Sequence, residues 1–164
     1  GDDPRFEITF DGGARVIDGA PASGAHAILW GTSSIGCDGL PRKGADMSAF
    51  IPGARDSVLA EAWGARLAAL LLCSTDRPSR CRIPAYNLGI VNFRAGFSRF
   101  AASRVVEVLV GPLADVAISS HRISRHAVRR RWNAAADAGA TAAVLRAARA
   151  AGRTLLPWVE RRVF

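Results

Sequence analysis

The sequence predicts a domain of the α/β class, with a mixed sheet of five strands flanked by helices. Apolar and polar residues alternate near the start of the chain, apolar residues recur at helical spacing further on, and strand-like segments then alternate with helix-like ones. A chain of 164 residues, 49% hydrophobic and 22% charged, is long and apolar enough to bury a core without disulfides. Strands at the front, followed by this alternation, are typical of a sheet with helical cover.

The first three strands are expected in the first third of the chain. In "RFEITF", Phe6, Ile8 and Phe10 alternate with polar residues, and this strand should end at the glycine pair that follows. A second strand, "SGAHAILWG", should follow a turn within "DGAPASG". Residues 31–45 are rich in Gly, Ser and Pro and should form a loop before a third strand, "MSAFIP".

Helices dominate the rest of the predicted domain. Asp56 and Ser57 offer capping oxygens to a first helix with leucines at helical spacing. "RCRIP" should be a strand, "NLGIVNFRAGFSRFAA" a second helix, and "RVVEVLVGPLADVA" a third helix, bent or interrupted at its Gly-Pro pair. "ISSHRISRHAV" should be the fifth strand and residues 133–151 the last helix. We expect residues 1–152 to form the domain and residues 153–164 a C-terminal docking tail.

The charge of the chain favours an anionic partner. The formal net charge is +8 and comes almost entirely from arginine, since Lys43 is the only lysine. Nucleic acid and an acidic protein surface fit this charge best. Three cysteines without a CxxC spacing indicate a reducing compartment, and the arginine content would suit the mitochondrion. No apolar run reaches the roughly 18 residues that a membrane span needs.

Three acidic residues stand at the starts or ends of predicted elements. Asp11 ends the first strand, Glu61 lies early in the first helix, and Asp137 lies near the start of the last helix. Asn133 precedes Asp137 by four residues, which puts both on one helix face. Carboxylates brought together from three elements would bind a hard divalent cation such as Mg²⁺.

Four segments in series resemble ribonuclease H domains, most closely those of retrotransposons. "FDGGARVIDGAPASGAHAILWG" resembles the first hairpin of the family, "LAEAWGARLAALL" its first helix, "AYNLGIVNFRAGFSRF" its Gly-Asp-Asn-Leu segment, and "AVRRRWNAAADAGATAA" its closing Asn-x-x-x-Asp motif. The resemblance implies the ribonuclease H fold over about residues 6–150. It also implies an endonuclease that uses two divalent ions, Mg²⁺ or Mn²⁺, to cut the RNA strand of RNA/DNA hybrids.

The resemblance assigns catalytic, metal-binding roles to Asp11, Glu61 and Asp137. The fourth metal ligand is missing, because the Gly-Asp-Asn of the family reads Ala-Tyr-Asn here and Tyr86 replaces the aspartate. A phenol has a pKa of about 10 and is neutral at pH 7. Three carboxylates do not balance the charge of two Mg²⁺ ions. The resemblance therefore implies a domain that has lost catalysis and keeps three acids as a remnant.

Nucleic-acid contacts are expected from a further set of residues. The arginines between residues 122 and 131 form the densest basic stretch, and alternate members of a strand share one face, where they can bind phosphates. The turn that reads Arg-Gly-Asn-Pro-Gly in many relatives is Arg-Val-Ile-Asp-Gly here, with bulkier residues. The expected contact residues are Arg15, Asn87, Arg125, Arg129, Arg130, Arg131 and Asn133.

Three functions stay open from the sequence. The favoured one, based on Tyr86 and the altered turn, is a noncatalytic ribonuclease H-like domain that serves as a structural or accessory subunit of a larger assembly, with other protein subunits as partners. The second is an active two-metal ribonuclease H. The third is a noncatalytic module that binds RNA or a hybrid.

Overall fold

The computed structural model describes residues 5–35, 41–75, 80–84, 104–120, 122–126, 130–154 and 156–164. Its strands are β1 (Arg5–Ile17), β2 (Ala20–Ile35), β3 (Pro41–Pro52), β4 (Arg80–Pro84), β5 (Arg122–His126) and β6 (Trp158–Val163). Its helices are α1 (Ser57–Cys73), α3 (Arg104–Ser120) and α4 (Arg130–Ala150). The helix expected in "NLGIVNFRAGFSRFAA" lies outside the described residues. None of the described helices is both long and apolar enough to cross a lipid bilayer.

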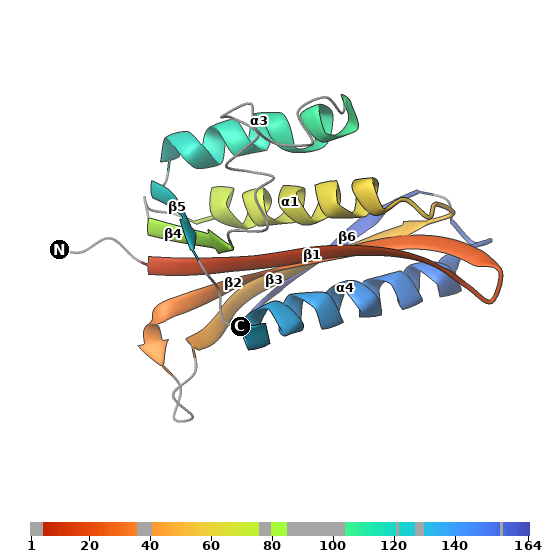
Figure 1. Ribbon diagram of the computed structural model, residues 1–164, viewed down its shortest axis with the longest axis horizontal. Coiled ribbons are helices and arrows are strands. Elements are labelled where there is room, and N and C mark those ends of the chain that lie inside the picture. Colours follow the sequence, from red (N-terminus) through yellow and green to blue (C-terminus); the bar gives the residue numbers. More distant parts are fainter. Residues whose placement is uncertain are drawn as a thin grey trace.

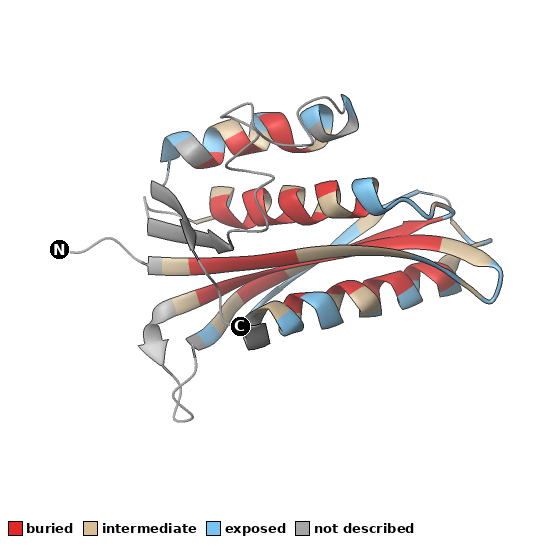
Figure 2. Ribbon diagram, in the orientation of Figure 1, coloured by how far each residue is buried: buried red, intermediate tan, exposed pale blue. Residues whose placement is uncertain are grey.

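The helices cover the two faces of one sheet (Figure 1). Helix α1 lies on one face with α3 stacked on it, and α4 lies on the opposite face. Buried residues concentrate where α1 and α4 face the strands (Figure 2). On the α1 side the core includes Ile8 and Phe10, and on the α4 side a smaller cluster includes Phe50 and Val144. The alternation of apolar residues in β1 therefore marks the face that α1 covers.

The sheet has six strands in the order β5-β4-β1-β2-β3-β6. Strands β1, β2, β3 and β6 are antiparallel neighbours, and β4 and β5 follow beside β1 in parallel. The predicted α/β class is confirmed. The expected count of five strands is wrong, because the segment "WVERRV" forms a sixth strand that pairs with β3.

The β1–β2 hairpin is longer than the sequence suggests. Strand β1 continues through its glycine pair to Ile17, and the turn consists only of Asp18 and Gly19. Both turn residues have positive φ, 51° and 78°, as in the two-residue type I′ turn, whose twist matches that of the strands it joins. The expected turn "DGAPASG" is therefore mostly strand. Strand β3 also starts earlier than expected, at Pro41, because it pairs along β2.

Helix α1 begins where its capping residues predict. Asp56 Oδ1 accepts hydrogen bonds from the N–H groups of Val58 and Leu59, at 3.0 and 3.1 Å. These bonds satisfy backbone donors that have no partner inside the helix. The predicted strand "RCRIP" is likewise present as β4.

Helix α3 is continuous through Gly111 and Pro112, so the expected interruption is wrong. A proline inside a helix removes one backbone donor and leaves a carbonyl unpaired. The carbonyl that Pro112 leaves without its helical donor is that of Val108, and α1 holds the next one, since Arg66 Nη1 donates a hydrogen bond to the Leu109 carbonyl at 2.8 Å. Packing on α1 thus outweighs the local signal to stop the helix.

Candidate active site

Asp11 lies on β1 beyond the point where this strand pairs with β4. That parallel pairing covers Arg5 to Glu7, so within the described part of the chain Asp11 has a paired strand only on the β2 side, where it is opposite His26. The Gly12 N–H donates a hydrogen bond to Asp11 Oδ1 at 2.8 Å. Among the described strands, Asp11 therefore has no neighbour on its β4 side, and side chains of α1 and α4 act on it.

Two glycines bring α1 against β1 and place Glu61 near Asp11. A Cβ atom at Gly12 would collide with the carbonyl group of Ala60, and the next residue in α1 is Glu61. One turn further along α1, a Cβ at Gly64 would lie 3.1 Å from the backbone oxygen of Asp11. Such a close approach of helix and strand backbones is possible only with glycine at the contact. The negative charge of Glu61 consequently acts on the Asp11 carboxyl group.

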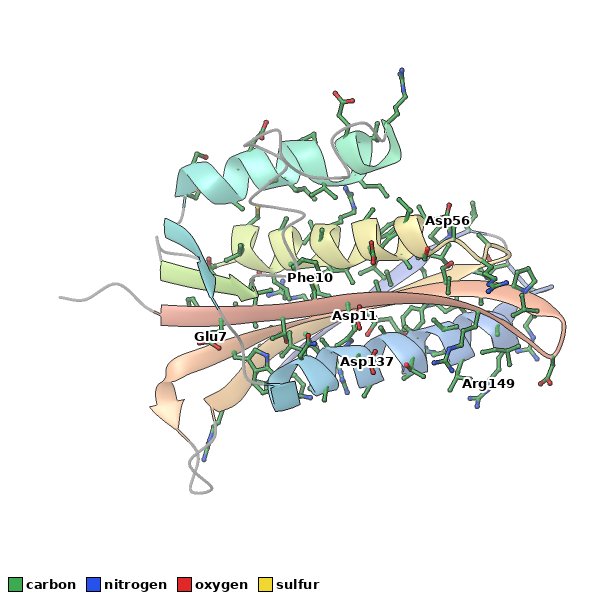
Figure 3. All side chains as sticks on the ribbon, in the orientation of Figure 1. Glu7, Phe10, Asp11, Asp56, Asp137 and Arg149 are labelled. Atoms are coloured by element: carbon green, nitrogen blue, oxygen red, sulfur yellow. The ribbon has the colours of Figure 1, made fainter. Side chains whose placement is uncertain are left out.

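Helix α4 approaches the other face of the sheet in the same way. A Cβ at Gly24 of β2 would collide with the backbone of α4 at Ala143 and Val144. Two residues after Asp137, Gly139 lies directly against the side chain of His26. This approach brings the carboxyl groups of Asp137 and Asp11 within hydrogen-bonding reach (Figure 3).

Burial and the neighbouring acids raise the pKa of Asp11. Its pKa is raised from 3.8 to about 6, with burial as the largest cause. The hydrogen bond with Asp137 and the charges of Asp137 and Glu61 raise the pKa further, while the Gly12 N–H lowers it. The raised pKa means that the folded domain disfavours the ionised form of Asp11. A divalent cation at this place would neutralise the carboxylates in place of a proton.

The donors present are of the kind that Mg²⁺ and Mn²⁺ prefer. Carboxylates from α1 and α4 act on the Asp11 carboxyl group of β1, and hard divalent cations take oxygen ligands. Among the described residues, no group of three or more His, Cys, Asp or Glu side chains is arranged as a ready-made metal site. Asp11 is the common neighbour of Asp137 and Glu61. The three acids thus fit a divalent cation by chemistry, with Asp11 at their centre.

The structure describes the other expected site residues only in part. Asn133 lies one turn before Asp137 on α4, and its side-chain oxygen is buried with no hydrogen-bond partner among the described residues. Arg15 is exposed near the end of the β1–β2 hairpin. Only the backbone is described for Arg125 on β5 and for Arg130 and Arg131 at the start of α4, and Tyr86, Asn87 and Arg129 lie outside the described residues.

The residues that bring the acids together were not predicted from the sequence. The available signal was glycine inside segments that otherwise read as strand or helix, namely Gly24, Gly64 and Gly139. Two buried polar side chains on the α4 side of the sheet, His26 and Asp46, were also not predicted, and they are 4% and 1% exposed. Their partners come from distant parts of the chain, and no local pattern announces such pairs.

The solved structures that match this fold include ribonuclease H domains. The N-terminal RNase H domain of rv2228c from Mycobacterium tuberculosis is 20% identical with a TM-score of 0.66, over 90% of this chain and 98% of that chain. RNase H1 from the halophilic archaeon Halobacterium salinarum is 17% identical with a TM-score of 0.58, over 87% and 98%. LC11-RNase H1 in complex with an RNA/DNA hybrid is 19% identical with a TM-score of 0.54, over 87% and 98%.

No protein-family model and no curated protein sequence matches the chain. The similarity therefore lies in the three-dimensional arrangement, at identities too low to carry an activity across. Three structures match over at least 87% of this chain and 98% of their own length. This similarity is one of overall fold. The chain is therefore a domain of the ribonuclease H fold.

Proposed function

We propose that this domain binds RNA or RNA/DNA hybrids, holds a divalent cation at Asp11, Glu61 and Asp137, and has lost strand cleavage. The observation that carries the proposal is the meeting of three acids from three elements, with the pKa of Asp11 raised to about 6. Carboxylates held together without a cation repel each other. A bound cation accounts for an arrangement that is otherwise unfavourable.

Asp11 would be the central ligand, because both other acids act on it. Mg²⁺ or Mn²⁺ held there would contact phosphate oxygens and lower the pKa of a bound water. Asn133 would support the same surface, since it precedes Asp137 by one turn and its buried amide oxygen has no hydrogen-bond partner among the described residues.

The proposed loss of cleavage rests on Tyr86. A neutral phenol in place of a carboxylate leaves three negative charges for two dications. The second ion should therefore bind more weakly than the first. Cleavage of this class needs both ions, one at the attacking oxygen and one at the leaving oxygen. Substrate binding does not, because arginines bind the phosphates directly.

The net charge of +8 supports a nucleic-acid partner. One structural neighbour, LC11-RNase H1, is described in complex with an RNA/DNA hybrid. A binding surface of arginines predicts an affinity that falls steeply with salt, by close to one power of the salt concentration for each phosphate contact. A flat response to salt would remove hybrid binding from the proposal.

The test is a comparison of the natural chain with Tyr86→Asp on a hybrid with labelled RNA. We expect the natural chain to bind the hybrid without cutting it in Mg²⁺ or Mn²⁺. Tyr86→Asp should cut the RNA strand, because the restored carboxylate completes the charge balance for two cations. Fluorescence anisotropy measures the binding, and gel electrophoresis of the labelled strand measures the cutting.

Two control variants separate charge from size. Tyr86→Phe keeps the ring and should stay inactive, and Asp11→Asn combined with Tyr86→Asp should abolish the restored cleavage. If the natural chain cuts the hybrid, and Asp11→Asn removes that activity, the domain is an active nuclease instead. That alternative is favoured by the same observation, since three of the four acids are still present.

We further propose that the domain acts as an accessory subunit of a larger assembly. Large apolar side chains are exposed at the C-terminal end, among them Leu156, Val163 and Phe164, at 76%, 71% and 63%. Isolation of the native protein with stably associated subunits is the expected result. A native protein that is a free monomer would contradict this part of the proposal.

A further inference from the structure

One arginine connects the outermost strand to the interior of the sheet. Arg162 of β6 donates from Nε to Asp46 Oδ1 at 3.0 Å and from Nη2 to Asp46 Oδ2 at 2.6 Å. The Asp46 side chain is only 2% exposed, whereas that of Arg162 is 66% exposed. Because a buried carboxylate is very unfavourable without a partner, Asp46 depends on this two-pronged contact.

Asp46 in turn holds the ring of His26. His26 Nε2 lies 3.4 Å from Asp46 Oδ2, and His26 Nδ1 is hydrogen-bonded to the Ser48 hydroxyl at 2.7 Å. A neutral ring with its proton on Nε2 satisfies both contacts. Burial lowers the pKa of His26, against the opposing effect of Asp46, and this favours the neutral form. The ring is therefore fixed at both of its nitrogen atoms.

His26 lies between the sheet and the part of α4 that carries an acid of the candidate active site. Gly139 is packed on the imidazole ring so closely that there is no space for a Cβ atom. Asp137 is two residues before Gly139, and His26 is opposite Asp11 in the β1–β2 pairing. A displacement of the ring would therefore shift α4 at the point where Asp137 meets Asp11.

Strand β6 is also attached to α4 directly. Arg146 of α4 donates hydrogen bonds to both carboxylate oxygens of Glu160, and its guanidinium lies 4.7 Å from the centre of the Phe50 ring. Phe50 in turn stacks on Trp158 of β6, with 4.8 Å between the ring centres. Strand β6 thus links β3 to α4 near the C-terminal end of the helix. Arg162 acts nearer the middle of α4, through Asp46 and His26, at Gly139.

We propose that β6 is a positioning strand for the candidate active site, in which Arg162 holds Asp46 and His26 beneath Gly139 and so fixes Asp137 against Asp11. Arg162 is a positioning residue, since it acts through Asp46 and His26. The consequence for cation binding rests on the proposed function, whereas the effect on α4 does not.

The test compares Arg162→Gln with Arg161→Gln in the full chain. Both changes remove one positive charge from β6, but Arg161 is on the other face of the strand, opposite Met47 in the pairing with β3. We expect Arg162→Gln to speed amide hydrogen exchange in residues 133–144 of α4 by about tenfold, with exchange in α1 changed less than about twofold. Titration with Mn²⁺ should show about tenfold weaker binding, and Arg161→Gln should change both measurements by less than about twofold.

Arg162→Lys provides a second variant if the glutamine variant does not fold. Lysine keeps the charge but not the planar fork, so we expect a smaller effect, about threefold, in the same part of α4. Equal acceleration in α1 and α4 in the variant that folds would mean a general loss of stability and would overturn the proposal. So would exchange no different from that of Arg161→Gln. If α4 loosens selectively while the natural chain binds no Mn²⁺, the positioning role stands and the proposed cation site fails.

Discussion

Gly12→Ala should destabilise the domain by about 3 kcal/mol, because the new methyl group has no free space. It would occupy the position of the Ala60 carbonyl and lie against the backbone nitrogen of Glu61. Backbone atoms cannot rotate away as a side chain can, so α1 must move off β1 and take Glu61 away from Asp11. Urea unfolding followed by circular dichroism measures the loss as a lower midpoint with an unchanged slope.

The neighbouring glycine provides the matched control. A Cβ at Gly13 would lie 3.7 Å from Val144 Cγ2, which is an ordinary van der Waals contact. Gly13→Ala should therefore change the stability by less than about 1 kcal/mol. Equal unfolding midpoints for the two variants would show that α1 does not approach β1 as closely as described.

Asp11→Asn should stabilise the cation-free domain at neutral pH by about 1 to 2 kcal/mol. A pKa raised from 3.8 to about 6 means that the folded state disfavours the ionised carboxylate. The shift of about two units corresponds to roughly 3 kcal/mol, which partial exposure of the site to solvent reduces. Asparagine keeps the size of the side chain and removes the charge, so the cost of burying a carboxylate disappears, together with the smaller repulsion from Asp137 and Glu61.

The pH dependence of this gain follows from the sign of the shift. Because the pKa of Asp11 is higher in the folded state, its favourable contribution is complete below pH 3.8 and is lost as the pH rises through about 6. The gain from Asp11→Asn should thus be absent below pH 3.8 and grow up to about pH 6. Unfolding in EDTA across this range measures it.

Added Mn²⁺ should change the stability of the natural chain and of Asp11→Asn differently. The natural chain should gain stability from the bound cation, whereas Asp11→Asn should not, since it lacks the central ligand. Asp18→Asn is the control, because Asp18 is exposed in the hairpin turn and asparagine tolerates its positive φ of 51°. A natural chain that is more stable than Asp11→Asn in EDTA at pH 7 would contradict the repulsion among the acids.

Elements with a strong local signal could be predicted from the sequence. The capping residue Asp56 located the start of α1, and the alternation around Ile8 located the core face of β1. Strand β6 lacked such a signal because residues 159–164 are all exposed, which leaves no apolar alternation to read. Its pairing with β3 and the ion pair of Arg162 are tertiary contacts between residues more than 100 positions apart.

The chemistry of the candidate site was easier to predict than its geometry. The positions of Asp11, Glu61 and Asp137 at the starts or ends of elements suggested that they would meet, and the structure brings Asp137 and Glu61 to Asp11. How closely they meet depends on the backbone approach at Gly12 and Gly139. In the sequence, the only sign of a close approach between two backbones is a small residue in each segment. Because glycine has many other uses in proteins, this sign does not identify the contact.

The stacking of α3 on α1 determines how motion of α3 can reach the candidate active site. In the described part of the chain, α3 contacts α1 and β5 but not β1, which carries Asp11, or α4, which carries Asp137. A local opening of α3 would expose the outer side of α1 and leave the pairing of β1 with β2 intact. Among the described elements, such an opening reaches Asp11 and Asp137 only through α1, the helix that carries Glu61.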